Sequence, residues 1–266
     1  HHLSSRRQRQ MCIRDRYSAD FLIDRGYTLV QPPLMMNRKA YEGVTDLSDF
    51  ENVMYGVEPD GYYLIATSEH PLTAMMMDEV IEQNNLPIKL VGVSPCFRRE
   101  VGAHGMSDRG IWRVHQFTKV EQVIICKPEE SWGFHTELLN NAKDLWDSLG
   151  LHYRVVDICT GDMGTVASRK YDLEAWLPGA GEFKEVVSCS NCTDYQANRL
   201  KMRYRKSGGN EAVHTLNSTA VATSRALVAI MEQYQTDDGS VIVPDVLVPA
   251  MRGKKILLPN LSLIHI

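Results

Sequence analysis

The chain has 266 residues, of which 44% are hydrophobic and 23% are charged, and this balance is typical of a globular protein with one large core. No apolar run approaches the roughly 18 residues that a membrane-spanning helix needs, and the six cysteines are too sparse for a disulfide scaffold. These features exclude a membrane protein and a disulfide-rich secreted domain, so we expect one domain located in the cytoplasm.

The two ends of the chain differ from its middle. Residues 1–16 hold five arginines and no apolar periodicity, and residues 260–266 form a short apolar tail. Both resemble translated adapter sequence, and a disordered basic arm that touches RNA is the alternative for the first segment. The whole chain carries −4; residues 1–16 contribute five Arg and one Asp, or +4, so residues 17–266 sum to −8. Such an acidic body is a poor general binder of nucleic acid.

The sequence predicts many strands and few helices, without a regular alternation of strand and helix. The first predicted element is the end of a helix, residues 17–25, so we expect the chain to begin inside a helix. The others, in chain order, are strands at 27–33 and 62–67, a helix at 71–83, strands at 89–100 and 111–125, a helix at 129–149, strands at 153–158, 170–177, 182–188 and 214–217, and a helix at 218–235. This order predicts an α+β fold whose mostly antiparallel sheet is flanked by helices.

The segment 111–121, IWRVHQFTKVE, is unusually polar for a strand that continues into a fully apolar run. If it is extended, alternate side chains fall on one face. That face carries Ile111, Arg113, His115, Phe117, Lys119 and Glu121. Cations for phosphates, a ring for a base and a carboxylate for an ammonium indicate the floor of a ligand site. A solvent-facing edge is the alternative.

A glycine-rich loop, residues 101–110, separates this strand from the preceding one, on which Arg98 and Glu100 share a face. It is too long for a tight hairpin, and long loops on a rigid sheet commonly contact substrates.

Four segments together resemble one known family. SPCFRREVGAHGMSDRGIWRVHQFTKVEQ is similar to the second signature motif of class II aminoacyl-tRNA synthetases, in the form found in seryl-tRNA synthetases. LIATSEHPL, FKEVVSCSNCTDYQANR and HTLNSTAVATSRALVAIMEQYQ agree with the same family in the same order. The resemblance covers residues 17–259 and implies a class II catalytic domain.

The resemblance also implies a nucleotide site. Arg98 is the motif arginine, expected to contact the α-phosphate and the activated carboxylate, and Arg225 is expected to face the γ-phosphate. Phe117 is expected to stack on adenine, with Val114 beside it. The full implied ATP-binding set is Arg98, Arg99, Glu100, Val114, Phe117, Glu185, Val186, Val187, Ser188 and Arg225, with Glu185 and Ser188 also holding magnesium.

A serine site is implied in the same way. Glu121 is expected to meet the α-ammonium, and Asn217 and Thr219 to close around the side chain. The full implied serine-binding set is Thr67, Ser68, Glu69, Arg98, Glu121, Asn217 and Thr219. Each has a structural alternative: Glu121 as an ion-pair partner, Thr67 as a strand threonine and Arg225 as a solvated helix residue.

Cys189 and Cys192 form a lone CxxC without a second pair at zinc-site spacing, so we expect no zinc. His115 is interpreted as a packed strand histidine rather than a general base.

The implied activity is ATP-dependent and magnesium-dependent formation of seryl-adenylate, followed by transfer of the seryl group to tRNA(Ser) and, as an open question, tRNA(Sec). We expect a homodimer for the full-length protein, and a chain without the family's tRNA-binding helical arm or the start of its first motif. Contact with tRNA would then fall mainly to the loop at residues 101–110. Two alternatives remain: a serine or amino-acid:carrier-protein ligase of the same fold, and a non-catalytic RNA-binding paralogue.

Overall fold

A seven-stranded sheet organises the computed structural model, which describes residues 16–47, 51–100 and 110–259. Its strand order is β1-β6-β7-β13-β10-β9-β8. The strands are β1 (Thr28–Val30), β6 (Ile88–Phe97), β7 (Gln116–Cys126), β8 (Tyr153–Asp157), β9 (Arg169–Leu177), β10 (Glu182–Thr193) and β13 (His214–Ala222). Only β1 and β6 pair in parallel; the other neighbours are antiparallel. The predicted α+β fold with a mostly antiparallel sheet is confirmed.

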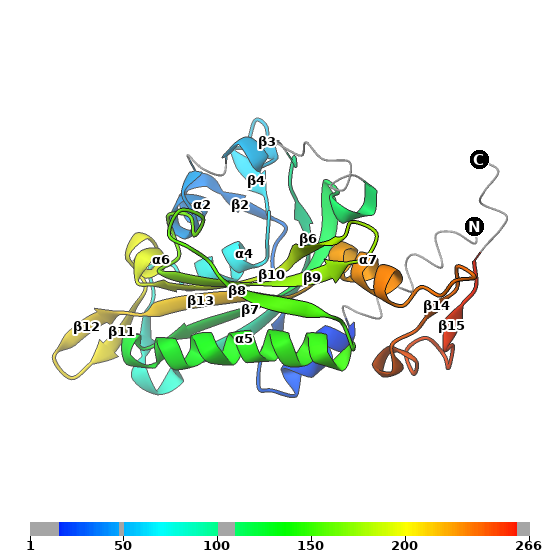
Figure 1. The fold of residues 1–266 in the computed structure, drawn as a ribbon. Coiled ribbons are helices and arrows are strands. Elements are labelled where there is room, and N and C mark those ends of the chain that lie inside the picture. Colours follow the sequence, from blue (N-terminus) through cyan, green and yellow to red (C-terminus); the bar gives the residue numbers. More distant parts are fainter. Residues whose placement is uncertain (1–15, 48–50, 101–109, 260–266) are drawn as a thin grey trace.

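One face of the sheet is covered by α5 (Ser131–Ser148), which runs beneath it in Figure 1. The helix buries Leu138, Leu145 and Trp146 against the sheet residues Val120 and Ile124. Trp146 also donates its indole N–H to the carbonyl oxygen of Ala220 on β13, 3.1 Å away. The helix ends at Ser148, and Gly150, which has a φ of +66, lets the chain turn back into β8. The predicted helix at 129–149 is confirmed.

The opposite face carries shorter elements, drawn above the sheet in Figure 1. They are α2 (Arg38–Val44), α4 (Glu69–Ala74), α6 (Tyr195–Arg199) and the small sheet of β2 (Met35–Asn37), β3 (Gly56–Val57) and β4 (Tyr62–Leu64). A second hydrophobic cluster, centred on Tyr41, Ile65 and Leu200, joins them. At Gly92 on β6, an added Cβ would lie 2.7 Å from the Leu72 side chain. The absence of a side chain there lets α4 sit close to the sheet.

Smaller elements complete the fold at its two ends. A hairpin of β11 (Arg203–Lys206) and β12 (Gly209–Ala212) pairs with β5 (Val80–Glu82), and β14 (Val241–Ile242) pairs with β15 (Ile256–Leu257). Figure 1 shows the hairpin projecting at the end opposite β14 and β15. No helix in the three described ranges is long and apolar enough to cross a membrane.

The predicted helix at 71–83 is wrong beyond its first turn. The helix α4 ends at Ala74, and Asp78 adopts a φ of 62 that a helix does not accommodate. Val80–Glu82 then pairs with β11, more than 120 residues later in the chain. A strand fixed by so distant a partner leaves little trace in its local sequence.

The predicted helix at 218–235 begins too early. Residues 218–222 extend β13, where they pair with β7, and α7 (Thr223–Gln233) starts only afterwards. The β-branched Thr219 and Val221 suit this strand.

The strand predicted at 111–125 also begins late. Gly110–Trp112 is a 3₁₀ turn, and β7 starts at Gln116. Simple alternation therefore holds from Phe117 onward and not for residues 111–115.

Candidate active site

A cavity of about 420 Å³ opens on the face of the sheet opposite α5, within the usual range for a small-molecule site. Strands β7, β10 and β13 contribute side chains to its lining, and α4 and α7 contribute Glu69 and Arg225. The cavity therefore draws on segments separated by more than 150 residues.

Strand register places the central polar side chains together. Glu121 on β7 pairs directly with Gly92 on one side and with Thr219 on the other. Asn217 lies two residues before Thr219 and so faces the same way. A bulge after Thr219 lets Ala220 turn its carbonyl toward α5 while Thr219 stays on the cavity side.

Glu121 is the centre of a buried network. Its carboxylate lies 2.6 Å from Lys119 Nζ, and the two side chains are only 1% and 8% exposed. Thr219 Oγ1 donates to Glu121 Oε2 over 3.2 Å, and Asn217 Nδ2 donates to Glu121 Oε1 over 3.3 Å. A carboxylate with this many donors is held in one orientation.

Glu69 belongs to the same network. Asn217 Nδ2 also donates to Glu69 Oε2 over 3.1 Å, so one amide group bridges two carboxylates. Burial, followed by the negative charge of Glu121, raises the pKa of Glu69 to about 7. Glu69 therefore binds a proton more readily than an exposed carboxylate would. A bound ammonium would favour its ionised form.

Arginine and aromatic residues make up another part of the lining. The guanidinium of Arg98 lies 5.6 Å from the centre of the Phe117 ring, and its Nε donates to the carbonyl oxygen of Ala66. Glu100, which has a φ of 53, pairs with Arg113 over 2.9 Å. Arg98 has no carboxylate partner among the described residues, so its charge is available to an anion.

Arg225 extends from α7 into the cavity. Its Nη1 donates to the carbonyl oxygen of Glu185 over 2.9 Å and lies 3.5 Å from the Glu185 carboxylate. Its guanidinium also lies 5.6 Å from the ring centre of Trp112. Since the side chains of Arg225 and Glu185 are 23% and 47% exposed, this pair is open to exchange with a charged ligand.

Hard oxygen ligands gather beside this pair. Ser188 and Glu185 line the cavity, and Asp172 lies directly opposite Ser188 on β9. Burial and the Glu185 charge raise the pKa of Asp172 to about 6, and its buried Oδ1 has no hydrogen-bond partner among the described residues. Carboxylate and hydroxyl oxygens suit magnesium, so these residues fit the cation expected with a nucleotide.

Most of the predicted site residues line this one cavity. Those that do are Thr67, Glu69, Arg98, Glu100, Val114, Phe117, Glu121, Glu185, Val186, Ser188, Asn217, Thr219 and Arg225. Ser68, Arg99 and Val187 are not among the lining residues. Arg99 lies over the Tyr55 ring, Val187 is in the core, and Ser68 is buried against Gly92.

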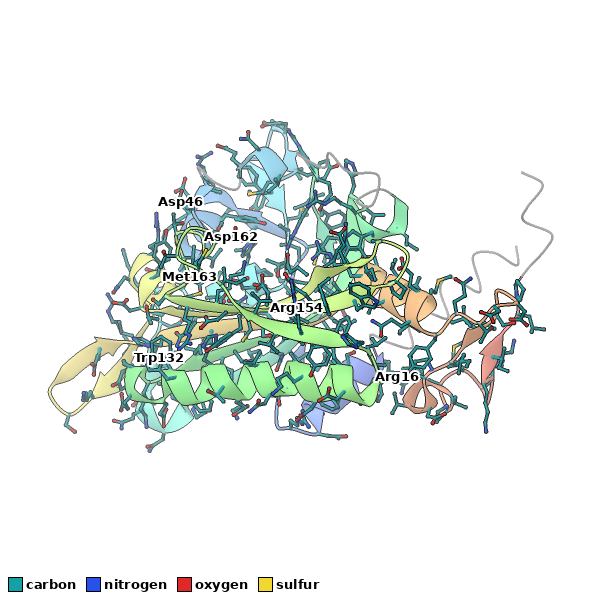
Figure 2. The ribbon with its side chains drawn as sticks, viewed as in Figure 1. Arg16, Asp46, Trp132, Arg154, Asp162 and Met163 are labelled. Atoms are coloured by element: carbon teal, nitrogen blue, oxygen red, sulfur yellow. The ribbon has the colours of Figure 1, made fainter. Side chains whose placement is uncertain are left out.

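Several lining residues have a role or a position that the sequence does not predict. Lys119 was placed on the charged face as a cation for phosphates, but it is paired with Glu121. Trp112 was placed on the opposite face, and the loop containing Met163 and Gly164 was not considered at all. Figure 2 labels Met163 on the side of the sheet away from α5. Strand alternation places Lys119 on the same face as Glu121, but the ion pair between them is visible only in the structure.

The two cysteines of the CxxC segment lie on opposite sides of β10. Cys189 contacts the carbonyl oxygen of His135 in α5, whereas the Cys192 thiol donates to Asn217 Oδ1 over 3.8 Å beside the cavity. The absence of zinc stays a prediction. Residues 101–109 of the loop predicted at 101–110 lie outside the described residues.

The chain matches one protein-family model and is similar to curated proteins along most of its length. The model of the tRNA synthetase class II core domain (G, H, P, S and T) matches residues 55–234. A serine--tRNA ligase from Methanocorpusculum labreanum is 60% identical over 245 residues, which are 91% of this chain and 58% of that protein. The chain thus spans less than two thirds of the length of such relatives.

Two solved structures of seryl-tRNA synthetases also superpose on most of this chain. A seryl-tRNA synthetase from Pyrococcus horikoshii complexed with ATP superposes with a TM-score of 0.91 at 51% identity, covering 94% of this chain and 57% of that one. A cytoplasmic serine-tRNA ligase from Naegleria fowleri in complex with AMP gives 0.90 at 44% identity, covering 95% and 60%.

Proposed function

We propose that this chain, which belongs to the class II aminoacyl-tRNA synthetase family through its core domain, activates L-serine with ATP and transfers the seryl group to tRNA(Ser). One observation carries the proposal. A buried carboxylate network around Glu121 lies in the same cavity as Arg98, whose charge has no carboxylate partner among the described residues. An amino acid with its ammonium at Glu121 can present its carboxylate to Arg98.

The first step is an in-line attack. An oxygen of the serine carboxylate bonds to the α-phosphorus of ATP, the bond to the β-phosphate oxygen breaks, and pyrophosphate leaves with that electron pair. No general base is needed because the carboxylate is already ionised at neutral pH. Arg98 would neutralise charge at the α-phosphate, and Arg225 would do so at the γ-phosphate. Most of the rate enhancement would therefore come from positioning.

Serine recognition follows from the network. Glu121 and Glu69 offer carboxylates to the ammonium, while Thr219 and Asn217 offer polar groups to the hydroxyl. Alanine would leave these buried groups unpaired, and a site of this kind can reject an analogue lacking its hydroxyl by about 10⁴. Thr67, whose Oγ1 accepts from the Glu69 backbone N–H, helps to set the position of Glu69.

Phe117 provides the face on which adenine would stack, beside Val114, and Glu100 the group for the adenine edge. Glu185 and Ser188 would hold the magnesium that arrives with ATP, which supplies charge neutralisation to the phosphates. The nucleotide would also be contacted by the backbone or at its periphery, by Arg99, Val186 and Val187. Serine would be contacted in the same manner by Ser68.

The remaining proposals concern the whole protein. They are a catalytic domain at residues 17–259 between non-native ends, a homodimer, a cytoplasmic location, and tRNA(Sec) as a second tRNA substrate. The domain limits, the homodimer and tRNA(Sec) rest on the family resemblance of the sequence, and the location is supported by one relative, the Naegleria fowleri enzyme, which is described as cytoplasmic.

The test is serine-dependent exchange of pyrophosphate into ATP, followed by charging of tRNA(Ser). Because the chain spans 58% of the length of a curated relative, charging should be measured on the product of the complete reading frame. Exchange with serine and no charging would favour the carrier-protein ligase. Absence of exchange with any amino acid would favour the non-catalytic paralogue.

A further inference from the structure

Gln196 in α6 is a buried residue that lies behind the serine pocket rather than in its lining. It is 1% exposed and makes three side-chain hydrogen bonds. Its Nε2 donates to Glu69 Oε1 over 3.2 Å and to the carbonyl oxygen of Val44 over 2.9 Å. Its Oε1 accepts from Thr215 Oγ1 over 2.6 Å. These contacts connect α6 with α4, α2 and β13.

The chemistry of the partners fixes the orientation of this amide. A carbonyl oxygen and a carboxylate can only accept, so both require the NH₂ side of Gln196. The Thr215 hydroxyl can donate to the remaining oxygen. If the amide were rotated by half a turn, its oxygen would face two other acceptors, the Val44 carbonyl and the Glu69 carboxylate, and none of the three oxygens would then have its donor. The arrangement is therefore directional.

We infer that Gln196 is a positioning residue for the serine pocket, which holds the Glu69 carboxylate toward Asn217 and keeps it an acceptor for the substrate ammonium. The inference rests on the proposed serine activation. Glu69 receives one hydrogen bond on each oxygen, from Gln196 on Oε1 and from Asn217 on Oε2. Without Gln196, Asn217 would be the one remaining hydrogen-bond donor to the carboxylate in the described part of the chain, and Asn217 is shared with Glu121.

Gln196 also affects the ionisation of Glu69. A donor to a carboxylate stabilises its charged form, so the Gln196 bond lowers the pKa of Glu69 against the larger effects of burial and of Glu121. The other charged and titratable groups facing Glu69 are Lys119 on β7, Arg98 after β6, Tyr41 on α2 and Cys192 on β10. The two cations also favour the ionised form. Loss of the Gln196 donor should therefore move the ionisation of Glu69 to higher pH.

The experiment uses Gln196→Met, which has nearly the same volume and no donor. For the wild-type protein, kcat/KM for serine in ATP–pyrophosphate exchange should fall as pH decreases through about 7, because Glu69 gains a proton. In Gln196→Met the KM for serine should rise about tenfold with a smaller change in kcat, as expected for a lost hydrogen bond to a charged group. The midpoint of the pH profile should move upward by about half a unit or more.

Thr215→Val supplies a second, milder variant because it removes only the donor that orients the Gln196 oxygen. It should move both quantities in the same direction by a smaller amount, and it keeps the inference testable if Gln196→Met does not fold.

Gln122→Met is the matched control. Gln122 is another fully buried glutamine, and its side chain bonds to Leu138 and Asn141 on the α5 side of the sheet. It should lose stability without moving the pH midpoint. Equal midpoints in Gln196→Met, Thr215→Val and wild type would overturn the inference. An absence of serine-dependent exchange in the wild type would instead overturn the proposed function.

Discussion

The two ends of the cavity are built on different principles. At the end proposed to bind serine (the serine end), Glu121 is 1% exposed and Lys119, Asn217 and Thr219 all bond to it. At the end proposed to bind the phosphates (the phosphate end), Arg225 and Glu185 are 23% and 47% exposed, and Arg225 contacts a backbone carbonyl and a ring. The first end is a closed polar network, while the second keeps cations near weak partners.

The contrast follows from the ligands that each end is proposed to hold. A small amino acid must be distinguished from close analogues, and fixed hydrogen-bonding groups do this best. A triphosphate with magnesium brings its own strong charges, so its site needs cations that can change partners. The serine end should therefore be sensitive in stability and specificity, and the phosphate end mainly in nucleotide affinity and rate.

The largest effect is expected at the closed end, from breaking the Lys119–Glu121 pair. Glu121→Met leaves the Lys119 charge buried without its partner, so the free energy of unfolding should fall by about 3 kcal/mol or more. The double variant Lys119→Met/Glu121→Met should recover much of that stability but none of the serine-dependent exchange. Urea denaturation and exchange assays measure the two quantities. A double variant that is no more stable than Glu121→Met would show that the pair is not the source of the loss.

The second effect concerns Arg98, which lines the cavity beside Phe117. Arg98→Ala should lower kcat of exchange by about 10²–10³, since it removes a group proposed to stabilise developing phosphate charge. Its folding should change little, because with the described residues the side chain makes only a backbone hydrogen bond and a ring contact. Arg154→Ala, which removes an arginine paired with Glu174 on the sheet edge, is the control and should keep wild-type exchange. Unchanged exchange in Arg98→Ala would falsify the mechanism.

The sequence allowed much of the fold and most of the site to be predicted, but not the local turns. Local signals were sufficient for α5, whose apolar face and terminal Gly150 lie within one segment. They were insufficient for β5, whose strand partner lies far along the chain. The same limit explains Trp112: a 3₁₀ turn at Gly110 rotates it into the cavity, whereas strand alternation placed it on the other face.

The site residues were predicted for a different reason. Arg98, Phe117 and Glu121 were assigned by resemblance to a family, and strand register then brings them into one cavity with Asn217 and Thr219. The residues that support the site, Lys119 and Gln196, were not assigned a role by the family resemblance. Lys119 and Gln196 become meaningful only when their buried partners Glu121 and Glu69 are known.

A third prediction tests how closely the serine end depends on packing beneath it. Gly92→Ala would place a Cβ 2.7 Å from Leu72 Cδ1 and 2.9 Å from the Ser68 side chain, so α4 should shift away from the sheet. The free energy of unfolding should fall by about 1–3 kcal/mol, and the KM for serine should rise because Glu69 begins that helix. Gly133→Ala in α5, where an added Cβ meets nothing within 4 Å, is the control. It should be neutral or stabilising, and a similar response in both variants would argue against the proposed packing.

The smallest effect is expected at the open end, from Trp112. Its ring lies 5.6 Å from the Arg225 guanidinium, a contact worth about 0.5–2 kcal/mol. Trp112→Leu should therefore raise the KM for ATP by a few-fold while the KM for serine stays constant, and Trp112→Phe should restore part of the loss. Trp132→Leu on α5, whose side chain lies on the far side of the sheet in Figure 2, should change neither constant. If the KM for serine rose as much as that for ATP, the two ends would be coupled through Trp112, and the division between a closed and an open end would not hold.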